Sequence, residues 1–445
     1  GLCDKQIANI KRIINNNSDV KKQIFDKFVQ EINNTLNGNL SDDGVCELLA
    51  QHLVMQPIME ELFTVRKNVS KDLTNAKTAE LFDSNNSQNN SQNNSQNNSK
   101  NNSQNLVENV IYNYAEQNPI AKAMNNIFYQ LDADSLQTLK NNLSRFRGDL
   151  HRKIQYTKHN DYNVISAAQK QNIIRQLFDK FFKIAFPKQQ EKLGIVYTPL
   201  EIVDFINHSV NDLLQQEFNQ QISDQNVHIL DPFTGTGSFL TRLMQNDIII
   251  PKDKLEYKFK NDLHANEIMP LSYYVAGINF ETVFHEILPD ATYEPNQILT
   301  WTDTFANDKF ILQQQQQQSK QITLFDNVDL QENNLHLQKQ NDSDIRIIIG
   351  NPPYSVGQKS QNDNNQNDKY EILDKRLQDT YVKHSTATLK NSLFDSYIRA
   401  FRWATDRIES NGIIGFVCNA GWLDSNAADG MRYCIEKEFA KIYIY

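Results

Sequence analysis

Residues 228–239 read HILDPFTGTGSF and decide the fold of the second half of the chain. The segment begins as a short apolar strand and ends where a helical pattern starts, so its two glycines fall in a strand-to-helix turn. Glycine has no Cβ atom, so the backbone of such a turn can approach a ligand closely. The chain has no phosphate loop of the GxxxxGKS or GxxxxGKT kind, and this turn lacks GxGxxG spacing. We therefore expect a ligand in this turn, the alternative being a tight turn that binds nothing.

Short apolar runs recur on both sides of this turn and alternate with helical patterns. This alternation is typical of a parallel α/β sheet. The expected strands are 228–230, 262–265, 297–300, 346–349 and 413–418. A Gln run at 313–318 and a polar segment at 358–369 interrupt the pattern and are expected to be surface loops.

A second motif, NPPY, occupies residues 351–354 directly after the apolar run 345–350. Tandem prolines stiffen the backbone and supply no N–H donors, which leaves carbonyl acceptors facing a ligand. Asn351 adds a side-chain carbonyl, and Tyr354 adds a ring that can stack on a planar group. Two acceptors and a ring suit a planar amine on an sp2 carbon. The motif predicts a catalytic loop, the alternative being a proline-stiffened turn, and its members are Asn351, Pro352, Pro353 and Tyr354.

The first half of the chain has a helical texture. Apolar residues recur at helical spacing in residues 1–83 and again in 106–186. Residues 84–105 between them form an Asn-Asn-Ser-Gln repeat with almost no apolar side chain, so we expect disorder there. The sequence predicts an all-α helical domain over 1–190 and an α/β domain over 191–445.

Composition limits the class of protein. The net charge is -9, whereas a dedicated DNA-binding domain is usually basic, so any contact with DNA should be local. The basic stretch 140–158 is interpreted first as a solvated helix face and second as a contact to a DNA backbone. Four scattered cysteines without a CxxC pair indicate a reduced, cytoplasmic protein with no structural metal. No apolar run is long enough to cross a membrane.

The two motifs resemble those of the S-adenosylmethionine-dependent amino-methyltransferases, over residues 190–445. The glycine turn precedes NPPY, which is the order of the gamma group of N(6)-adenine DNA methyltransferases. The resemblance implies a Rossmann-like methyltransferase fold, S-adenosyl-L-methionine as cofactor, and methyl transfer to adenine flipped out of double-stranded DNA. The NPPY loop also resembles enzymes that methylate a protein glutamine or a ribosomal RNA amine, so the substrate stays open here.

The resemblance also assigns cofactor-binding residues. The opening motif GIVYTP at 194–199 would close over the methionine end of the cofactor. Glu267 would bind the ribose hydroxyls, Asp303 would accept from the amine of the cofactor's adenine, and Phe305 would pack near that ring. Asp395, in a weaker later motif, is a further candidate, and each acid could instead be an ordinary turn carboxylate. The expected set is Tyr197, Thr198, Pro199, Asp231, Phe233, Thr234, Gly235, Gly237, Phe239, Glu267, Asp303 and Phe305.

The whole chain also resembles the coupler-plus-methyltransferase portion of type ISP single-polypeptide restriction–modification enzymes. Residues 49–54, which read LAQHLV, and residues 193–199 carry this likeness. It implies nuclease, helicase and target-recognition domains outside these 445 residues. We expect an excised fragment, truncated within the methyltransferase domain, with residues 441–445 forming a strand. A non-catalytic coupler fragment is the remaining alternative.

Overall fold

The computed structural model describes residues 2–15, 19–36, 38, 40–54, 118–131, 198–292, 298–307, 328–354, 370–408 and 410–445. The chain divides into two compact units. The first comprises Gly1–Ile32, Leu40–Leu177 and Gly277–Asn296, and the second comprises Asn33–Asn39, Phe178–Ala276 and Gln297–Tyr445. Several predictions lie outside the described residues, namely those for Tyr197, the repeat at 84–105, the basic stretch 140–158 and the polar segments at 313–318 and 358–369.

The described part of the first half is helical, as the sequence predicts. It contains α1 (Leu2–Asn15), α2 (Asp19–Leu36), a helical stretch at 42–54, and α5 (Pro119–Leu131). The apolar residues at helical spacing are the buried ones, among them Ile10, Phe25, Phe28, Ile32 and Leu49. Burial of one apolar stripe is what stabilises such amphipathic helices.

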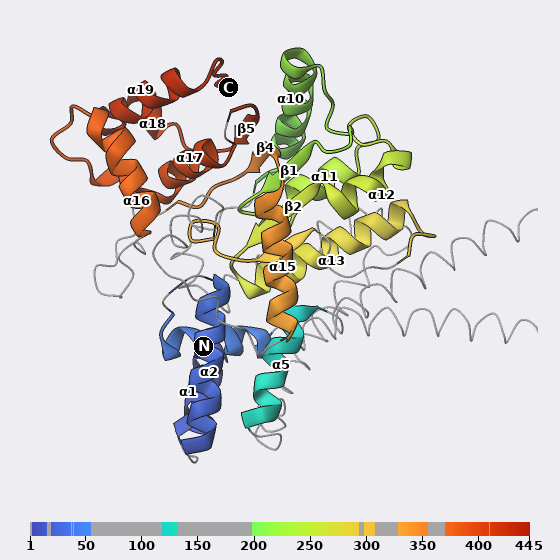
Figure 1. Cartoon of the computed structure of the whole chain (residues 1–445), viewed down its shortest axis with the longest axis vertical. Helices are drawn as coiled ribbons and strands as arrows, with labels where there is room; N and C mark the ends of the chain where they lie inside the picture. Colours follow the sequence, from blue (N-terminus) through green and yellow to red (C-terminus); the bar gives the residue numbers. More distant parts are fainter. Residues whose placement is uncertain are drawn as a thin grey trace, which may run out of the picture. The chain divides into compact units, whose positions relative to one another are not determined.

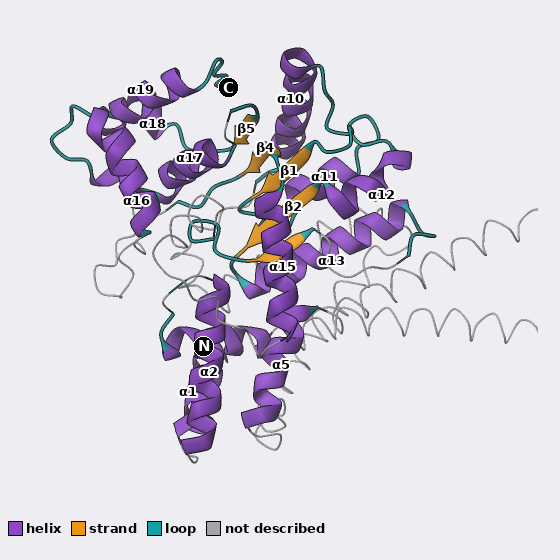
Figure 2. Cartoon of the chain, viewed as in Figure 1, coloured by secondary structure: helices purple, strands orange, loops and turns teal. Residues whose placement is uncertain are grey.

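The second unit is built on a parallel five-stranded sheet (Figure 2). Its strands are β1 (His228–Asp231), β2 (Leu263–Glu267), β3 (Leu299–Trp301), β4 (Ile345–Gly350) and β5 (Ile413–Phe416). All four neighbouring pairs are parallel. The five predicted strands and the α/β fold class are therefore confirmed.

The strand order β3-β2-β1-β4-β5 places β1 at the centre of the sheet. The chain runs outward from β1 through β2 to β3, then returns to lay β4 on the other side of β1. In open α/β sheets, ligands bind at the carboxyl ends of the strands where the direction of winding reverses. In this sheet that point lies between β1 and β4, so the loops after these two strands are the first place to look for a site.

Helices pack on both faces of this sheet (Figure 1). Helix α10 (Leu200–Phe218) lies against β5, where Gly415 lets the two backbones approach: a Cβ there would be 2.9 Å from Val210 Cγ2. Helix α17 (Ser396–Arg407) buries Ala400 and Trp403 in a cluster with Ile348 of β4. The other helices of this unit are α11 (Ser238–Met244), α12 (Lys252–Asn261) and α15 (Val328–Asp342). Helix α13 (Pro270–Ile287) is divided between the two units after Ala276.

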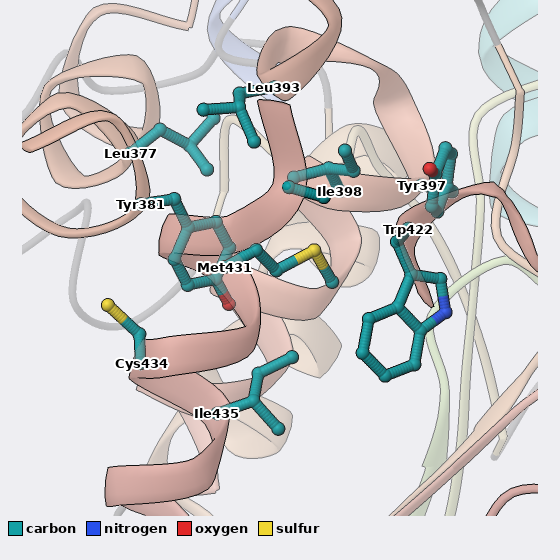
Figure 3. Packing of buried hydrophobic residues seen from close by; sticks show 10 residues of the cluster. Leu377, Tyr381, Leu393, Tyr397, Ile398, Trp422, Met431, Cys434 and Ile435 are labelled. Atoms are coloured by element: carbon teal, nitrogen blue, oxygen red, sulfur yellow. The ribbon is translucent and has the colours of Figure 1, made fainter. Parts of the chain in front are cut away.

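The segments after β4 form a smaller helical layer with its own core. Figure 3 shows Tyr381, Met431 and Trp422 packed together in this core. Gly430 lies so close to the backbone of the π-helix that a Cβ would collide with the Tyr381 carbonyl. The elements are α16 (Glu371–Leu377), a π-helix (Gln378–Val382), 3-10 turns (Asn391–Phe394 and Asn426–Ala428), α18 (Gly421–Asp424) and α19 (Asp429–Glu438).

The strand predicted for residues 441–445 is wrong. These residues have no regular secondary structure and are exposed. Lys441 binds Glu217 of α10 with an Nζ–Oε1 distance of 2.6 Å, and the Tyr445 ring meets the Phe205 ring edge-on at 5.1 Å. A strand needs a partner for its backbone groups, and in the described part of the chain β5 pairs with β4 alone.

Candidate active site

The two motifs singled out in the sequence start from one point of the sheet. Asp231 ends β1 and Gly350 ends the neighbouring strand β4. Gly350 has a φ of 157°, and a Cβ there would lie only 2.9 Å from Asp231 Oδ1. Glycine therefore lets the NPPY segment leave β4 directly beside the Asp231 carboxylate.

The glycine turn is tightly closed on one side and open on the other. The Thr234 hydroxyl donates to the Asp231 carbonyl at 2.9 Å, and the Gly237 N–H donates to the Thr234 carbonyl at 2.9 Å. Gly235 and Gly237 have left-handed φ values of 56° and 84°, which favour glycine. A Cβ on Gly235 would meet nothing within 4 Å, so the backbone here borders open space that a ligand can occupy.

Two buried carboxylates end the neighbouring strands β1 and β2 at this edge of the sheet. Glu267, at the end of β2, accepts from the Gly235 N–H at 2.8 Å and from the Met269 N–H at 2.7 Å. Asp231 Oδ1 accepts from the Phe233 N–H at 3.2 Å, while Asp231 Oδ2 is buried and has no hydrogen-bond partner among the described residues. An unpartnered buried acceptor is costly to leave unsatisfied, which points to a missing donor at this position.

Burial shifts both carboxyl groups toward the neutral form. Burial raises the pKa of Glu267 to about 7. Burial, and to a smaller extent the nearby Glu267, raises the pKa of Asp231 to about 8. A cation or a set of hydroxyl donors would favour the ionised carboxylates, so both groups are poised to change protonation state when such a ligand binds.

Asp303 and Phe305 follow β3 at the same edge of the sheet. Asp303 Oδ1 accepts from the Phe305 N–H at 3.0 Å, and Asp303 Oδ2 accepts from the Tyr370 hydroxyl at 3.0 Å. The Phe305 ring lies between the rings of Phe233 and Tyr370, with centroids 5.3 Å away in each case. Asp303 is only partly buried, so a ligand can reach its carboxylate.

The NPPY loop is held by contacts at both of its ends. The Asn351 side-chain N–H donates to the Thr198 hydroxyl at 3.1 Å. The Tyr354 hydroxyl, which has one hydrogen to donate, lies 2.9 Å from Asn351 Oδ1 and 3.2 Å from the Val417 carbonyl oxygen. The Tyr354 ring lies 6.0 Å from the Tyr397 ring, and burial raises the pKa of Tyr354 to about 12, so its hydroxyl stays protonated.

Some expected residues serve the scaffold around these loops. Pro199 precedes α10 and is exposed. Phe239 is buried in α11, and its carbonyl accepts from the Asn207 side chain at 3.1 Å. Asp395 caps α17 by accepting from the Tyr397 N–H at 3.3 Å.

Sequence reasoning missed Thr304 and Tyr370. The Thr304 hydroxyl donates to the Pro232 carbonyl at 2.7 Å and accepts from the Asn266 side chain at 3.2 Å, which ties the segment after β3 to the glycine turn. Thr304 lies between Asp303 and Phe305, two residues that the sequence analysis had assigned to the cofactor. Tyr370 follows a polar low-complexity segment, where no pattern indicates a functional residue.

The parallel sheet, with a glycine turn after β1, acidic residues after β2 and β3, and NPPY after β4, defines the class as an α/β methyltransferase fold. Residues 256–444 match the family of Eco57I restriction-modification methylases, and residues 1–110 match the coupler domain of type ISP restriction-modification enzymes. By these matches, the part of the chain from residue 256 to 444 belongs with the Eco57I restriction-modification methylases, and the first 110 residues belong with the type ISP coupler domains.

Three solved structures resemble the chain over almost its whole length. The type ISP enzyme LlaGI, a nuclease-deletion mutant in complex with a DNA substrate mimic, is 33% identical over 98% of this chain, with a TM-score of 0.75. The ATP-dependent type ISP enzyme LlaBIII bound to DNA is 36% identical over 97%, with a TM-score of 0.74. The DrdV–DNA complex is 27% identical over 98%, with a TM-score of 0.71. This chain spans 30%, 25% and 37% of those three chains, respectively. No curated protein matches it.

The described residues also limit other kinds of site. Within those ranges, no group of three or more His, Cys, Asp or Glu side chains could hold a metal ion. None of the helices in the same ranges has the length and apolar character needed to cross a membrane.

Proposed function

We propose that this restriction-modification methylase transfers a methyl group from S-adenosyl-L-methionine to the exocyclic amine of adenine in double-stranded DNA. The observation that carries the proposal is the meeting of the glycine turn and NPPY between β1 and β4. The Gly350–Asp231 approach and the oriented Asn351 side chain define that meeting point. We further propose a boundary near residue 190 between the helical coupler and the methyltransferase domain.

The side chains at this edge suit the proposed cofactor. The unpartnered Asp231 Oδ2 offers an acceptor for the cofactor's ammonium group, and the open backbone at Gly235 leaves room beside it. Glu267 would accept from the ribose hydroxyls, and Asp303 from the adenine amine. All of these groups are acceptors, whereas a phosphate-bearing cofactor would need donors or cations. When bound, the cofactor would supply an electrophilic methyl group on its sulfonium.

The protein's contribution to transfer would be to prepare the substrate amine. In adenine the amine's lone pair is delocalised into the ring, which makes it a poor nucleophile. Asn351 Oδ1 and the Pro352 carbonyl would accept its two hydrogens and so return the lone pair to the nitrogen. Asn351 Oδ1 lies 2.9 Å from the Tyr354 hydroxyl, and an amide oxygen can accept two hydrogen bonds. Positioning and fixed dipoles then supply the rate without a covalent intermediate.

A base inside a duplex cannot reach this loop, so the target adenine would be flipped out and stacked on Tyr354. We propose that the partners are double-stranded DNA together with nuclease, helicase and target-recognition domains in the same enzyme. The support is the likeness to type ISP enzymes, of which this chain spans less than half. The free, scattered cysteines at 46, 418 and 434 are compatible with a cytoplasmic location.

The proposal is tested by methyl transfer from radiolabelled S-adenosyl-L-methionine to three substrates: unmethylated DNA, ribosomes and a protein release factor. We expect label in DNA alone and, after digestion, in N(6)-methyladenine. Asn351→Ala should keep cofactor binding, measured by calorimetry, and lose transfer. Asn411→Ala, at an exposed position outside the site, is the matched control and should transfer normally.

Other outcomes would assign the chain differently. Label in ribosomes or release factor would move the substrate to RNA or protein. Undiminished transfer by Asn351→Ala would remove NPPY from the chemistry. Cofactor binding without transfer to any substrate would leave a coupler fragment that needs its missing domains.

A further inference from the structure

Tyr370 contacts a proposed cofactor residue from a distant part of the chain. Its hydroxyl donates to Asp303 Oδ2 at 3.0 Å, although the two residues are 67 positions apart. Asp303 follows β3, and Tyr370 directly precedes α16. Asp303 is the residue proposed to read the amine of the cofactor's adenine, so its orientation matters for which base the site accepts.

The protein fixes Tyr370 at three places. Its backbone N–H donates to Asp374 Oδ2 at 3.2 Å. Arg399 is 3% exposed, binds both oxygens of Asp374 at 2.7 and 3.1 Å, and places its guanidinium carbon 5.5 Å from the centre of the Tyr370 ring. The same ring meets the Phe305 ring edge-on at 5.3 Å. Because backbone and ring are both held, the hydroxyl is aimed at Asp303 rather than free to rotate away.

Tyr370 and the backbone together hold the Asp303 carboxylate from both sides. Asp303 Oδ1 accepts from the Phe305 N–H at 3.0 Å, and Asp303 Oδ2 accepts from Tyr370. Two donors on different oxygens fix the plane of a carboxylate, whose two oxygens together offer about four acceptor sites. The group is thus preorganised to accept from one amine in one direction.

We infer that Tyr370 is a positioning residue that orients Asp303 toward the cofactor's adenine and so sets the preference of the site for an amine at that position. The inference rests on the proposed function. Phenylalanine at 370 would keep the ring contacts with Phe305 and Arg399, so the hydroxyl has no role in that packing. The hydroxyl adds one hydrogen bond to a charged acceptor, and such bonds are stronger than those between two neutral groups.

The test compares two ligands that differ along one edge of the purine. S-adenosylhomocysteine carries the amine at C6 and an acceptor at N1, whereas S-inosylhomocysteine has a carbonyl oxygen at C6, which a carboxylate repels, and a hydrogen on N1. We expect the full chain to prefer the adenosyl compound by at least about tenfold in calorimetric titrations, as for other buried polar recognition. Tyr370→Phe should lower this ratio about fivefold or more by releasing the carboxylate. A merely structural loss would weaken both ligands alike and leave the ratio unchanged.

Tyr381→Phe is the matched control. Tyr381 lies in the same helical layer, and its buried hydroxyl has no hydrogen-bond partner within the part of the chain that the structure describes. This variant should keep the wild-type ratio, and Asp303→Asn should abolish the preference.

Each remaining outcome is decisive. An unchanged ratio in Tyr370→Phe overturns the inference and leaves the cofactor site standing. If the wild-type chain binds the adenosyl and inosyl compounds equally well, Asp303 does not recognise the adenine amine, and Tyr370 cannot orient it for that purpose. If the folded wild-type chain binds neither ligand, the proposed cofactor site fails and the inference fails with it.

Discussion

The Asn351 side chain donates to the Thr198 hydroxyl at 3.1 Å, across 153 residues of sequence. Thr198 lies just before α10, and Asn351 directly follows β4. An amide side chain has a donor end and an acceptor end, so a partner on the nitrogen decides where the oxygen points. Thr198 therefore directs Asn351 Oδ1 toward the Tyr354 side of the loop, where the substrate amine is proposed to bind.

Thr198→Val should slow methyl transfer while the chain stays folded. Valine matches threonine in shape but cannot hold the amide nitrogen, so Asn351 is free to turn its donor end to the substrate. Losing one such bond costs about 1.4 kcal/mol, which is about tenfold in kcat. Single-turnover transfer to DNA at saturating cofactor measures the effect. Thr198→Ser should restore the rate, and a wild-type rate in Thr198→Val would exclude the orienting role.

Cofactor binding should release protons near neutral pH. In the chain without cofactor, burial raises the pKa of Glu267 to about 7 and that of Asp231 to about 8. The groups of the proposed cofactor that would contact them favour the ionised carboxylates. Calorimetric heats at pH 7 should therefore depend on the ionisation enthalpy of the buffer, and this dependence should vanish near pH 9. Asp231→Asn should reduce the number of protons released. Buffer-independent heats at pH 7 in the wild type would contradict the assignment.

The same two groups should shape the stability of the cofactor-free chain. In the folded chain, the pKa values of Asp231 and Glu267 lie above their ordinary values of 3.8 and 4.5, respectively. At a pH between the ordinary and the raised pKa of each group, the folded state holds a proton that the unfolded state has lost. Stability therefore falls as pH rises from about 5 to 8. Thermal midpoints of the wild type should drop over this window more steeply than those of Asp231→Asn. Parallel curves for the two proteins would show that Asp231 is not the titrating group.

Gly430→Ala should destabilise the helical layer that follows β4. A Cβ at this position would collide with the Tyr381 carbonyl, which is backbone and cannot rotate away. Overpacking of this kind costs about 3 kcal/mol. The unfolding midpoint in urea measures it, with Gly38→Ala as control because a Cβ there meets no atom closer than 4.0 Å. Equal midpoints for the two variants would mean that α19 and the π-helix separate more easily than their packing indicates.

Local patterns predicted the elements of the α/β unit but not the contacts between them. The runs that became β1 and β4 are apolar because both faces of the sheet are covered, and this signal is visible in a single sequence. The same signal gave a wrong strand at 441–445, where apolar residues alternate but no strand of the described part of the chain pairs with them. Pairing is a property of the fold, and a short run does not encode its partner.

In the candidate site, too, local patterns predicted residues but not the contacts between them. Asp231, Glu267 and Asp303 could be placed because each follows a strand within a motif. The orienting partners Thr198 and Tyr370 meet their targets only because the topology brings distant strand ends together. Thr198 was expected at the cofactor, yet its observed contact is to Asn351 of the NPPY loop. Tyr370 borders a low-complexity segment and carries no local signal at all.

Lys258→Met should cost far more stability than Lys254→Met on the same helix. Lys258 Nζ donates to Asp262 Oδ2 at 2.9 Å and to the Val227 and Asp224 carbonyls at 2.7 and 3.0 Å, and both members of the ion pair are 0% exposed. Removing the cation leaves the Asp262 carboxylate buried and uncompensated, which costs about 3–5 kcal/mol. The Lys254–Asp224 pair is 3.9 Å apart and exposed, so its loss should cost at most about 1 kcal/mol.

Urea unfolding of the two variants measures this difference, and Lys258→Met combined with Asp262→Asn should recover part of the loss because no charge then remains buried. The pair lies at the amino ends of β1 and β2, whereas the proposed cofactor residues lie at the carboxyl ends. Folded Lys258→Met should therefore bind S-adenosylhomocysteine with wild-type affinity. Weakened binding at temperatures where the variant is fully folded would show that the two edges of the sheet are coupled. The buried ion pair would then influence the site as well as the fold.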